Sequence, residues 1–385
     1  SIVGRGLDAG AFPGCQVIVA RKGTVVFHKA YGYHTYEQRT GVRKHDLYDL
    51  ATVTKISGPL SGLMLLESMG RFSYQDRLGD YSGAMKGSDK ADLALKDVLA
   101  HRAGLFPWIP YHEKTLKKNG HYKKRYVRTD PGGKFTVQVA DRLYLSTKFK
   151  DKIFETIRKS DLGEQEYRYS GLSFFLFPTI IEELSGEDYE TFISENIYHR
   201  LGAWELLYHP RNEYPGSQIV PTEYDSLFRK QLIHGYVHDE GAALMGAHAG
   251  NAGLFASSND LLKLIEMYRR MGNYGGEQII REEVLMEYTS YQFPELKIHR
   301  GLGFDKPLLN EQDGSPEDYP CPGASPASFG HSGFTGTFVW ADPEHEISYV
   351  FLCNRVHPTR QNGLLYDMDI RTSILQSVID SIVEP

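Results

Sequence analysis

Thr52 and Lys55, within the stretch YDLATVTKISG at residues 48–58, are residues whose types and spacing could do chemistry together. A hydroxyl is a weak nucleophile at its own pKa and needs a neighbouring base. Residues three apart at the first turn of a helix share a face, so the Lys55 amine could reach the Thr52 hydroxyl. The free N–H groups at that helix start could also stabilise an oxyanion. The alternative is a threonine that only caps the helix, which is a common position for this residue type.

The spacing alone does not single out one site. Four threonines precede a lysine at this distance, and no serine does; they are Thr52, Thr115, Thr147 and Thr156. Only Thr52 lies between a predicted strand region and a long apolar helix. The context therefore favours Thr52 as the candidate nucleophile.

The elements around this site can be predicted from hydrophobic periodicity. Residues 15–33 alternate apolar and polar types around a Lys-Gly turn, which predicts a β-hairpin. Residues 54–69 have apolar side chains at helical spacing and end at Gly70. Residues 95–111 read as a short helix, a glycine stop and a proline-rich loop. Residues 111–165 are polar and rich in Lys and Gly, which is typical of an insertion or a lid.

The second half of the chain adds helices and a second strand pair. Residues 170–186 have a helical apolar face that Pro178 interrupts. An amphipathic helix follows, with Asn259 or Asp260 as its predicted cap. After Pro326, two strands form a hairpin around DPEHE at residues 342–346, and a last helix covers residues 367–383.

Strands at both ends of the chain predict one antiparallel sheet with helices packed on it. The expected fold class is α/β of the α+β type, a sandwich with an inserted all-helical region. We expect a single domain over residues 1–385. Its α/β part would comprise about 1–60 and 255–385, and its mainly helical part about 61–254.

Composition excludes some classes of function. The net charge of −6 gives no long-range attraction for nucleic acid or an anionic membrane. The basic run Lys114–Arg128 is a local exception, and such runs are more often solvated loops than binding sites. No run of 18 apolar residues predicts a membrane span. The three cysteines, Cys15, Cys321 and Cys353, lack metal-like spacing, and their odd number argues against a disulfide framework.

Several motifs occur in one order along the chain. YDLATVTKI is followed by VLAHRAGL at residues 98–105, by YRYSGLSF, and by GHSGFTGT near the C-terminus. Together they resemble the motifs of the serine β-lactamase and penicillin-binding-protein superfamily, in its class C β-lactamase-like, esterase and D-peptidase branch. GYVHDEGAALMG and GNAGLFASSNDL resemble a bacterial subgroup in which this domain can follow a glycoside hydrolase domain. The resemblance implies the β-lactamase-like sandwich fold.

The resemblance also implies catalytic roles. Thr52 stands at the acylated nucleophile position, with Lys55 beside it as a proton relay. Tyr169 resembles the second acid or base, whose phenolate form needs nearby cations near neutral pH. His331 stands where a lysine is usual, and its charge would change between about pH 5 and 8.

The remaining site residues implied by the resemblance bind the substrate. The backbone N–H groups of Thr52 and Phe334 would form the oxyanion hole. Substrate would contact Ser332, Gly333, Gly171 and Trp108. No cofactor is implied, and His101, His238 and Asp239 match no metal-site spacing.

Three positions depart from the family pattern. Threonine replaces serine at 52, Gly171 leaves no side-chain amide in the second motif, and Asn251 stands where the subgroup commonly has histidine. The added methyl crowds the attack position and stiffens χ1, and catalysis depends on geometry to within about 1 Å. These changes point toward weakened or lost hydrolysis.

Two functions of different classes follow from these features. The first is an acyl-transfer hydrolase acting on an ester, a peptide or a D-amino-acid bond of a small-molecule, peptide or glycan substrate; a β-lactamase proper is disfavoured by His331 and Gly171. The second is a catalytically inactive homologue that binds a cell-wall or glycan fragment in the cleft that corresponds to the active site of the family. A deliberate serine replacement to trap a complex is a third reading. The resemblance places the protein in the bacterial periplasm or outside the cell. The chain begins at Ser1 without an initiator methionine, which predicts a processed or trimmed chain.

Overall fold

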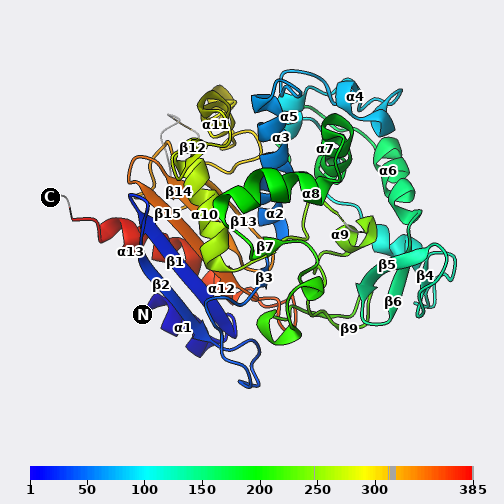
Figure 1. Cartoon of the computed structure of the whole chain (residues 1–385), viewed down its shortest axis with the longest axis horizontal. Helices are drawn as coiled ribbons and strands as arrows, with labels where there is room; N and C mark the ends of the chain where they lie inside the picture. The colour runs from blue at the N-terminus through cyan, green and yellow to red at the C-terminus, as the bar shows by residue number, and fades with distance from the viewer. Residues whose placement is uncertain (247, 311, 313–317, 384–385) are drawn as a thin grey trace.

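The computed structural model describes residues 1–246, 248–310, 312 and 318–383. Its centre is a five-stranded antiparallel sheet in the order β13-β14-β15-β1-β2. The strands are β1 (Gly14–Arg21), β2 (Thr24–Gly32), β13 (Phe329–Ser332), β14 (Phe338–Asp342) and β15 (Ile347–Cys353). In the middle of the sheet Ile18 lies opposite Val350, so the N-terminal and C-terminal strands pair directly. The predicted sheet from both chain ends is confirmed (Figure 1).

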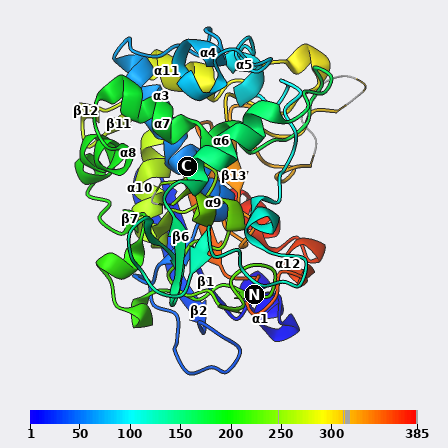
Figure 2. The ribbon, with the colours of Figure 1, turned by 90° about the vertical axis from the view of Figure 1, so that its right-hand side faces the viewer.

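Helices cover both faces of this sheet. Val17 and Val19 on β1 pack in one hydrophobic cluster with residues of α1 (Ile2–Ala9) and α13 (Ile370–Asp380). Ile18 and Ala20 point to the other face and join the larger cluster, to which α10 (Ser258–Arg269) contributes. Alternate residues of a strand face opposite sides of a sheet, so β1 is apolar on both faces and almost wholly buried. Figures 1 and 2 show α1 and α13 on the side of the sheet opposite to α10.

The chain between β2 and β13 contains most of the described helices but is not all-helical. It includes a separate three-stranded sheet of β4 (Val127–Arg128), β5 (Phe135–Ala140) and β6 (Leu143–Ser146). The expected all-helical insertion is therefore corrected at this point. The run FTVQVA at 135–140 alternates apolar and polar residues, which is the strand signal that the Lys- and Gly-rich composition obscured.

The segment after Thr52 forms three short helices instead of one. They are a 3₁₀ turn at Ala51–Val53, α2 (Thr54–Ser57) and α3 (Pro59–Ser68). The break falls at Gly58, where a Cβ atom would lie 2.7 Å from the Tyr189 hydroxyl. Pro59 then starts α3, a position that proline tolerates because it needs no backbone donor. The predicted helix start near Thr52 is confirmed, and its continuity is not.

Several predicted boundaries are also corrected. The cap of α10 is Ser257 and not the predicted Asn259 or Asp260. Its side chain accepts a hydrogen bond from the backbone N–H of Asp260. Pro178 lies in the first turn of α7 (Phe177–Ser185), so it begins a helix and does not interrupt one. The C-terminal strand pair has a third partner, β13, which the apolar alternation did not reveal because Gly330 and Ser332 interrupt it.

The other elements are short. Strands β3 (Tyr48–Asp49), β7 (Leu206–Leu207) and β10 (Phe255–Ala256) form one small sheet, and two further pairs are β8–β9 (Tyr224–Asp225, Gln231–Leu232) and β11–β12 (Asn273–Tyr274, Glu277–Gln278). The remaining helices are α4 (Leu78–Tyr81), α5 (Leu95–Leu99), α6 (Phe149–Lys159), α8 (Tyr189–Ile193), α9 (Glu240–Met245), α11 (Glu282–Tyr288) and α12 (Leu364–Asp367). No described helix has the length and apolar character needed to cross a membrane. All three cysteines are buried and free.

Candidate active site

Thr52 lies in a strained turn between β3 and α2. The preceding residue, Ala51, has a φ of +47°, a conformation that side chains other than glycine rarely adopt. The Ala51 N–H donates to Oδ1 of Asp49 at 2.7 Å, which holds the turn in this shape. Strain of this kind costs about 1–3 kcal/mol and is found most often at functional sites.

The buried Lys55 and the 37% exposed Tyr169 form a pair beside Thr52. The Lys55 Nζ atom lies 2.5 Å from the Tyr169 hydroxyl and 4.1 Å from the centroid of its ring. Burial lowers the pKa of Lys55 to about 7, and the nearby Arg300 cation acts in the same direction. Burial raises the pKa of Tyr169, although Arg300 opposes that shift. The Lys55 amine can therefore exchange a proton near neutral pH, whereas the Tyr169 hydroxyl keeps its proton.

The Thr52 hydroxyl does not contact the lysine in this conformation. It donates to the backbone carbonyl of Ser332 at 2.8 Å, while the described hydrogen bond of Lys55 goes to Tyr169. The expected direct contact between Thr52 and Lys55 is therefore absent here. Because a β-branched side chain has few χ1 rotamers, turning this hydroxyl toward Lys55 also relocates the methyl group.

His331 is neutral and does not replace the usual lysine charge. Its Nδ1 atom lies 2.8 Å from the Ser332 carbonyl, which accepts only, so Nδ1 carries the proton. The Nε2 atom is buried and has no hydrogen-bond partner among the residues placed in the structure. Burial, reinforced by Arg300 and Lys55, holds the pKa of His331 well below its usual value. The expected titration of His331 between about pH 5 and 8 is therefore corrected, because a desolvated imidazole beside cations stays neutral.

Arg300 supplies a buried positive charge that sequence reasoning missed. Its side chain is buried, and its guanidinium carbon lies 5.6 Å from the Tyr169 ring centroid. Asp305 pairs with it at 3.3 Å from Nη1 to Oδ1. Arg300 is a single arginine in the loop HRGLGFD and forms no recognisable motif with its neighbours in sequence. Only the fold therefore reveals that it faces the site.

His101 also belongs to the site, in a role other than metal binding. Its ring lies 4.3 Å from that of Tyr169, and its Nδ1 accepts a hydrogen bond from the Ser170 N–H. The other two residues weighed for a metal lie elsewhere: His238 bonds Glu223 at 2.7 Å, and Asp239 caps α9. His101 lies in the motif VLAHRAGL, and this motif could have identified it as a residue of the site.

The turn after β13 is clamped onto the turn that carries Thr52. Hydroxyls of Thr335 and Thr337 donate to the carbonyls of Asp49 and Leu50, at 2.8 Å and 2.9 Å. Within the described part of the chain, the N–H groups of Thr52 and Phe334 have no hydrogen-bond acceptor. Both residues line the same pocket, as an oxyanion hole requires.

The glycines and the tryptophan named from sequence have different surroundings. A Cβ atom at Gly333 would lie 2.0 Å from Oγ1 of Thr337, so only glycine fits there. A Cβ atom at Gly171 would lie 3.4 Å from Nζ of Lys55, so a side chain at this position would touch the Lys55–Tyr169 pair. Trp108 is 56% exposed and is not among the residues that line the pocket, so its role stays a prediction.

These residues surround an open pocket of about 540 Å³, a size typical of small-molecule sites. Thr52, Ser332, Gly333 and Phe334 line one part of it. Other lining residues are Tyr167, Tyr169, His299, Arg300, Asp305, Leu308, Tyr319, His331 and Tyr366. The pocket is therefore aromatic and polar, with the Arg300–Asp305 pair among its lining residues.

Known proteins resemble this chain over most of its length. A protein named "Putative D-alanyl-D-alanine carboxypeptidase" from Escherichia coli K12 is 27% identical over 383 residues, covering 91% of this chain and 80% of that protein. A class C beta-lactamase structure matches with a TM-score of 0.67 at 16% identity, covering 100% of this chain and 95% of that one. EstCE1, a hydrolase with promiscuous acyltransferase activity, also gives 0.67 at 17% identity, with 97% and 96% covered.

The structural matches, at these low identities, show the shared fold. The octameric penicillin-binding protein homologue from Pyrococcus abyssi adds a third example, with a TM-score of 0.67 at 19% identity over 98% of this chain and 76% of that one. The family assignment comes from the sequence itself. The model of the Beta-lactamase family matches residues 1–370, and this chain belongs to that family.

Proposed function

We propose that this protein is a hydrolase that works by acyl transfer, with Thr52 as the nucleophile. The observation that carries the proposal is the pair of the buried Lys55 and Tyr169, whose Nζ and hydroxyl atoms lie 2.5 Å apart, with Lys55 one helical turn after Thr52. A lysine with a pKa near 7 is half unprotonated at neutral pH and can therefore accept a proton.

In the first half of the reaction, the Thr52 hydroxyl turns away from the Ser332 carbonyl and gives its proton to unprotonated Lys55. The Thr52 oxygen then bonds to the substrate carbonyl carbon. The N–H groups of Thr52 and Phe334 bind the negative oxygen that forms. The leaving group departs as its bond to that carbon breaks, and it takes a proton from Lys55 through the Tyr169 hydroxyl.

In the second half, a water molecule gives a proton to the same pair and attacks the acyl carbon. The bond to Thr52 then breaks, the proton returns to the threonine oxygen, and the acid product leaves. Both halves use one proton that moves between Lys55, Tyr169 and the substrate, so the site ends in its starting state.

The substrate class we propose is an ester, a peptide or a D-amino-acid bond. The relatives named as D-alanyl-D-alanine carboxypeptidases and the hydrolase EstCE1 support this range. A periplasmic or secreted location and an associated glycoside hydrolase domain belong to the same proposal. They rest on the resemblance of the sequence motifs alone.

The experiment that tests the proposal is covalent labelling with a fluorescent penicillin and with a fluorophosphonate. We expect the wild type to be labelled slowly, Thr52→Ser to be labelled faster, and Thr52→Ala not at all. Equal labelling of the wild type and Thr52→Ala would place the nucleophile elsewhere.

A second candidate function is a binding protein that has lost hydrolysis. It is favoured by the hydrogen bond of the Thr52 hydroxyl to Ser332 and by Gly171, which offers no side chain beside Lys55. In that case the wild type resists labelling while Thr52→Ser is labelled stoichiometrically. Binding of cell-wall or glycan fragments by the unlabelled wild type would then be measured by calorimetry.

A further inference from the structure

A group of metal-ligating side chains lies outside the candidate active site. Glu190, His209 and His248 each offer one ligand atom, and these atoms all lie within 4.8 Å of one another. One pair of these atoms is already in hydrogen-bond contact, because Nε2 of His248 lies 3.0 Å from Oε2 of Glu190. Ligand atoms of a tetrahedral zinc ion with bonds of about 2.0–2.1 Å are roughly 3.3 Å apart, so modest side-chain rotation would close the group around an ion.

The three residues come from three separate segments. Glu190 lies in the first turn of α8, His209 follows β7, and His248 lies between α9 and β10. His209 has a φ of +49°, a left-handed conformation that is uncommon for histidine. The rings of Tyr189 and Tyr208 each lie 6.0 Å from that of His248 and pack around it.

Carboxylates surround His248. Asp188 lies 3.6 Å from Nδ1 of His248, and Glu182 belongs to a second possible ligand group with Asp188 and His248. Among the ion pairs of the described residues, no lysine or arginine pairs with Glu182, Asp188 or Glu190. Three carboxylates therefore share one neighbouring imidazole, and a divalent cation would balance them.

The ligand types indicate which cation. Two imidazoles and one carboxylate suit Zn²⁺ and related first-row ions, whereas Mg²⁺ and Ca²⁺ prefer all-oxygen sites. Asp188 faces the other ring nitrogen of His248, the position from which a carboxylate usually orients a metal-bound histidine. Three protein ligands leave a fourth position open on a tetrahedral ion.

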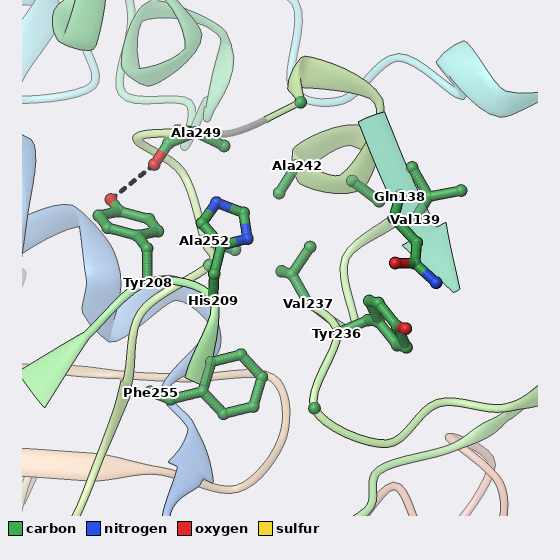
Figure 3. A pocket seen from close by; sticks show the side chains of 14 residues that line it. Gln138, Val139, Tyr208, His209, Tyr236, Val237, Ala242, Ala249, Ala252 and Phe255 are labelled. Carbon is green, nitrogen blue, oxygen red and sulfur yellow. Dashed lines mark hydrogen bonds between the residues drawn. The ribbon is translucent and has the colours of Figure 1, made fainter. Parts of the chain in front are cut away.

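A small cavity adjoins this group of ligands. His209 lines a space of about 30 Å³, enough for roughly one water molecule. Figure 3 shows the His209 ring beside Tyr208 and Ala252 in this cavity. A water molecule or a single small ligand would fit there next to an ion held by His209.

We propose that Glu190, His209 and His248 form a binding site for Zn²⁺ or a chemically similar ion. The ion ties the segment between α9 and β10 to α8 and to the turn after β7. That segment ends at Leu254, whose N–H donates to Oγ1 of Thr54 at 3.2 Å, two residues beyond Thr52. This hydrogen bond links the segment that carries His248 to the helix that follows the candidate nucleophile. Binding of the ion does not depend on the proposed hydrolase activity.

The proposal is tested by titrating metal-stripped protein comprising residues 1–385 with ZnCl₂ in a calorimeter, and with Co²⁺ while the visible spectrum is recorded. We expect one Zn²⁺ per chain with micromolar or tighter affinity, and the intense absorption of four-coordinate Co²⁺. His209→Ala and His248→Ala should each weaken binding at least 100-fold. Asp188→Asn should weaken it about 10–100-fold, because in the proposed site that carboxylate orients His248 and does not bind the ion.

The matched control is His45→Ala. His45 also contacts a carboxylate, Glu205, at 3.1 Å, yet among the residues that the structure describes it belongs to no group of three ligands. Its removal should leave affinity unchanged. Circular dichroism of each metal-free variant checks folding, and Glu190→Gln replaces any alanine variant that unfolds. Millimolar binding only, or binding that survives loss of both His209 and His248, would overturn the proposal.

Discussion

At the scale of single residues, the candidate site has its positive charge in an unexpected place. Arg300 and Lys55 are the cations beside Tyr169, and His331 is neutral. A tyrosine hydroxyl can act as an acid or a base near neutral pH only when cations stabilise its phenolate. The burial of Lys55, reinforced by the Arg300 charge, lowers the pKa of the lysine amine into a useful range.

The first prediction concerns pH. Unprotonated Lys55 is the proton acceptor, so kcat/KM should fall as the pH drops below about 7, the pKa of this amine. Arg300→Met removes a neighbouring cation and raises the pKa of Lys55, which moves this acid limb to higher pH. Arg300→Lys should retain the wild-type limb. Ester hydrolysis measured from pH 5 to 9 in Thr52→Ser checks both; an unmoved limb in Arg300→Met would contradict the account.

A second prediction concerns Gly171. Its backbone is in the ordinary right-handed helical region, with φ −90°, so other residues fit there. In Thr52→Ser/Gly171→Asn, an amide beside Lys55 can contact the substrate or the amine. We expect hydrolysis about 100-fold faster than in Thr52→Ser alone, the lower end of the range for one placed polar group. Gly171→Ala is the control and should give no gain in kcat.

At the scale of elements, two turns from distant parts of the chain make one site. The hydroxyls of Thr335 and Thr337 bind the carbonyls of the β3 turn and bring Phe334 to the pocket that Thr52 lines. Gly333 permits this contact, because a Cβ atom there would be 2.6 Å from the Leu50 carbonyl oxygen. The turn after β13 and the turn around Thr52 are therefore held together by hydrogen bonds from threonine side chains to backbone carbonyls.

Gly333→Ala should separate these turns. We expect a loss of about 1–3 kcal/mol in the free energy of unfolding, the usual cost of overpacking a dense region. Covalent labelling of Thr52→Ser should also be lost. Gly83→Ala is the control, because nothing lies within 4 Å of a Cβ atom at that position. Urea unfolding measures both variants, and equal stability would show that the clamp tolerates a side chain.

At the scale of the whole molecule, the sheet joins the two ends of the chain. Its central pair, β1 and β15, is buried on both faces, whereas β2 lies at the edge with Val26 62% exposed. Leu352 on β15 is fully buried in the larger hydrophobic cluster. Stability should therefore depend on the central pair far more than on the edge strand.

Leu352→Ala tests this dependence. Removing a fully buried leucine side chain should cost about 2–5 kcal/mol of unfolding free energy, because the cavity cannot fully collapse. Val26→Ala, on the exposed edge strand, should change it by less than about 0.5 kcal/mol. Denaturant unfolding of the two variants gives the comparison, and similar losses would contradict the assigned core.

The sequence predicted the sheet and the position of the candidate nucleophile because both depend on local patterns. Alternation in residues 15–33 marked the hairpin, and apolar spacing after Thr52 marked the helix. The family motifs indicated which residues to expect at the site. Arg300 could not be predicted, because it reaches Tyr169 only through the fold.

The neutral state of His331 and the rotamer of Thr52 could not be predicted either. Both depend on burial and on contacts between segments about 280 residues apart. The three-stranded sheet at β4–β6 was missed for a different reason. Its alternating run was short and lay within a segment whose overall composition is typical of a loop.

The central claim is that Thr52 is the acylated residue. Peptide mapping by mass spectrometry, after the wild-type protein is incubated with a fluorescent penicillin or a fluorophosphonate, tests it most directly. The account predicts a covalent adduct on the peptide that contains residues 48–58, assigned to Thr52 by fragmentation and absent from Thr52→Ala. An adduct on any other residue, or a wild-type peptide that stays unmodified after prolonged incubation, would contradict it.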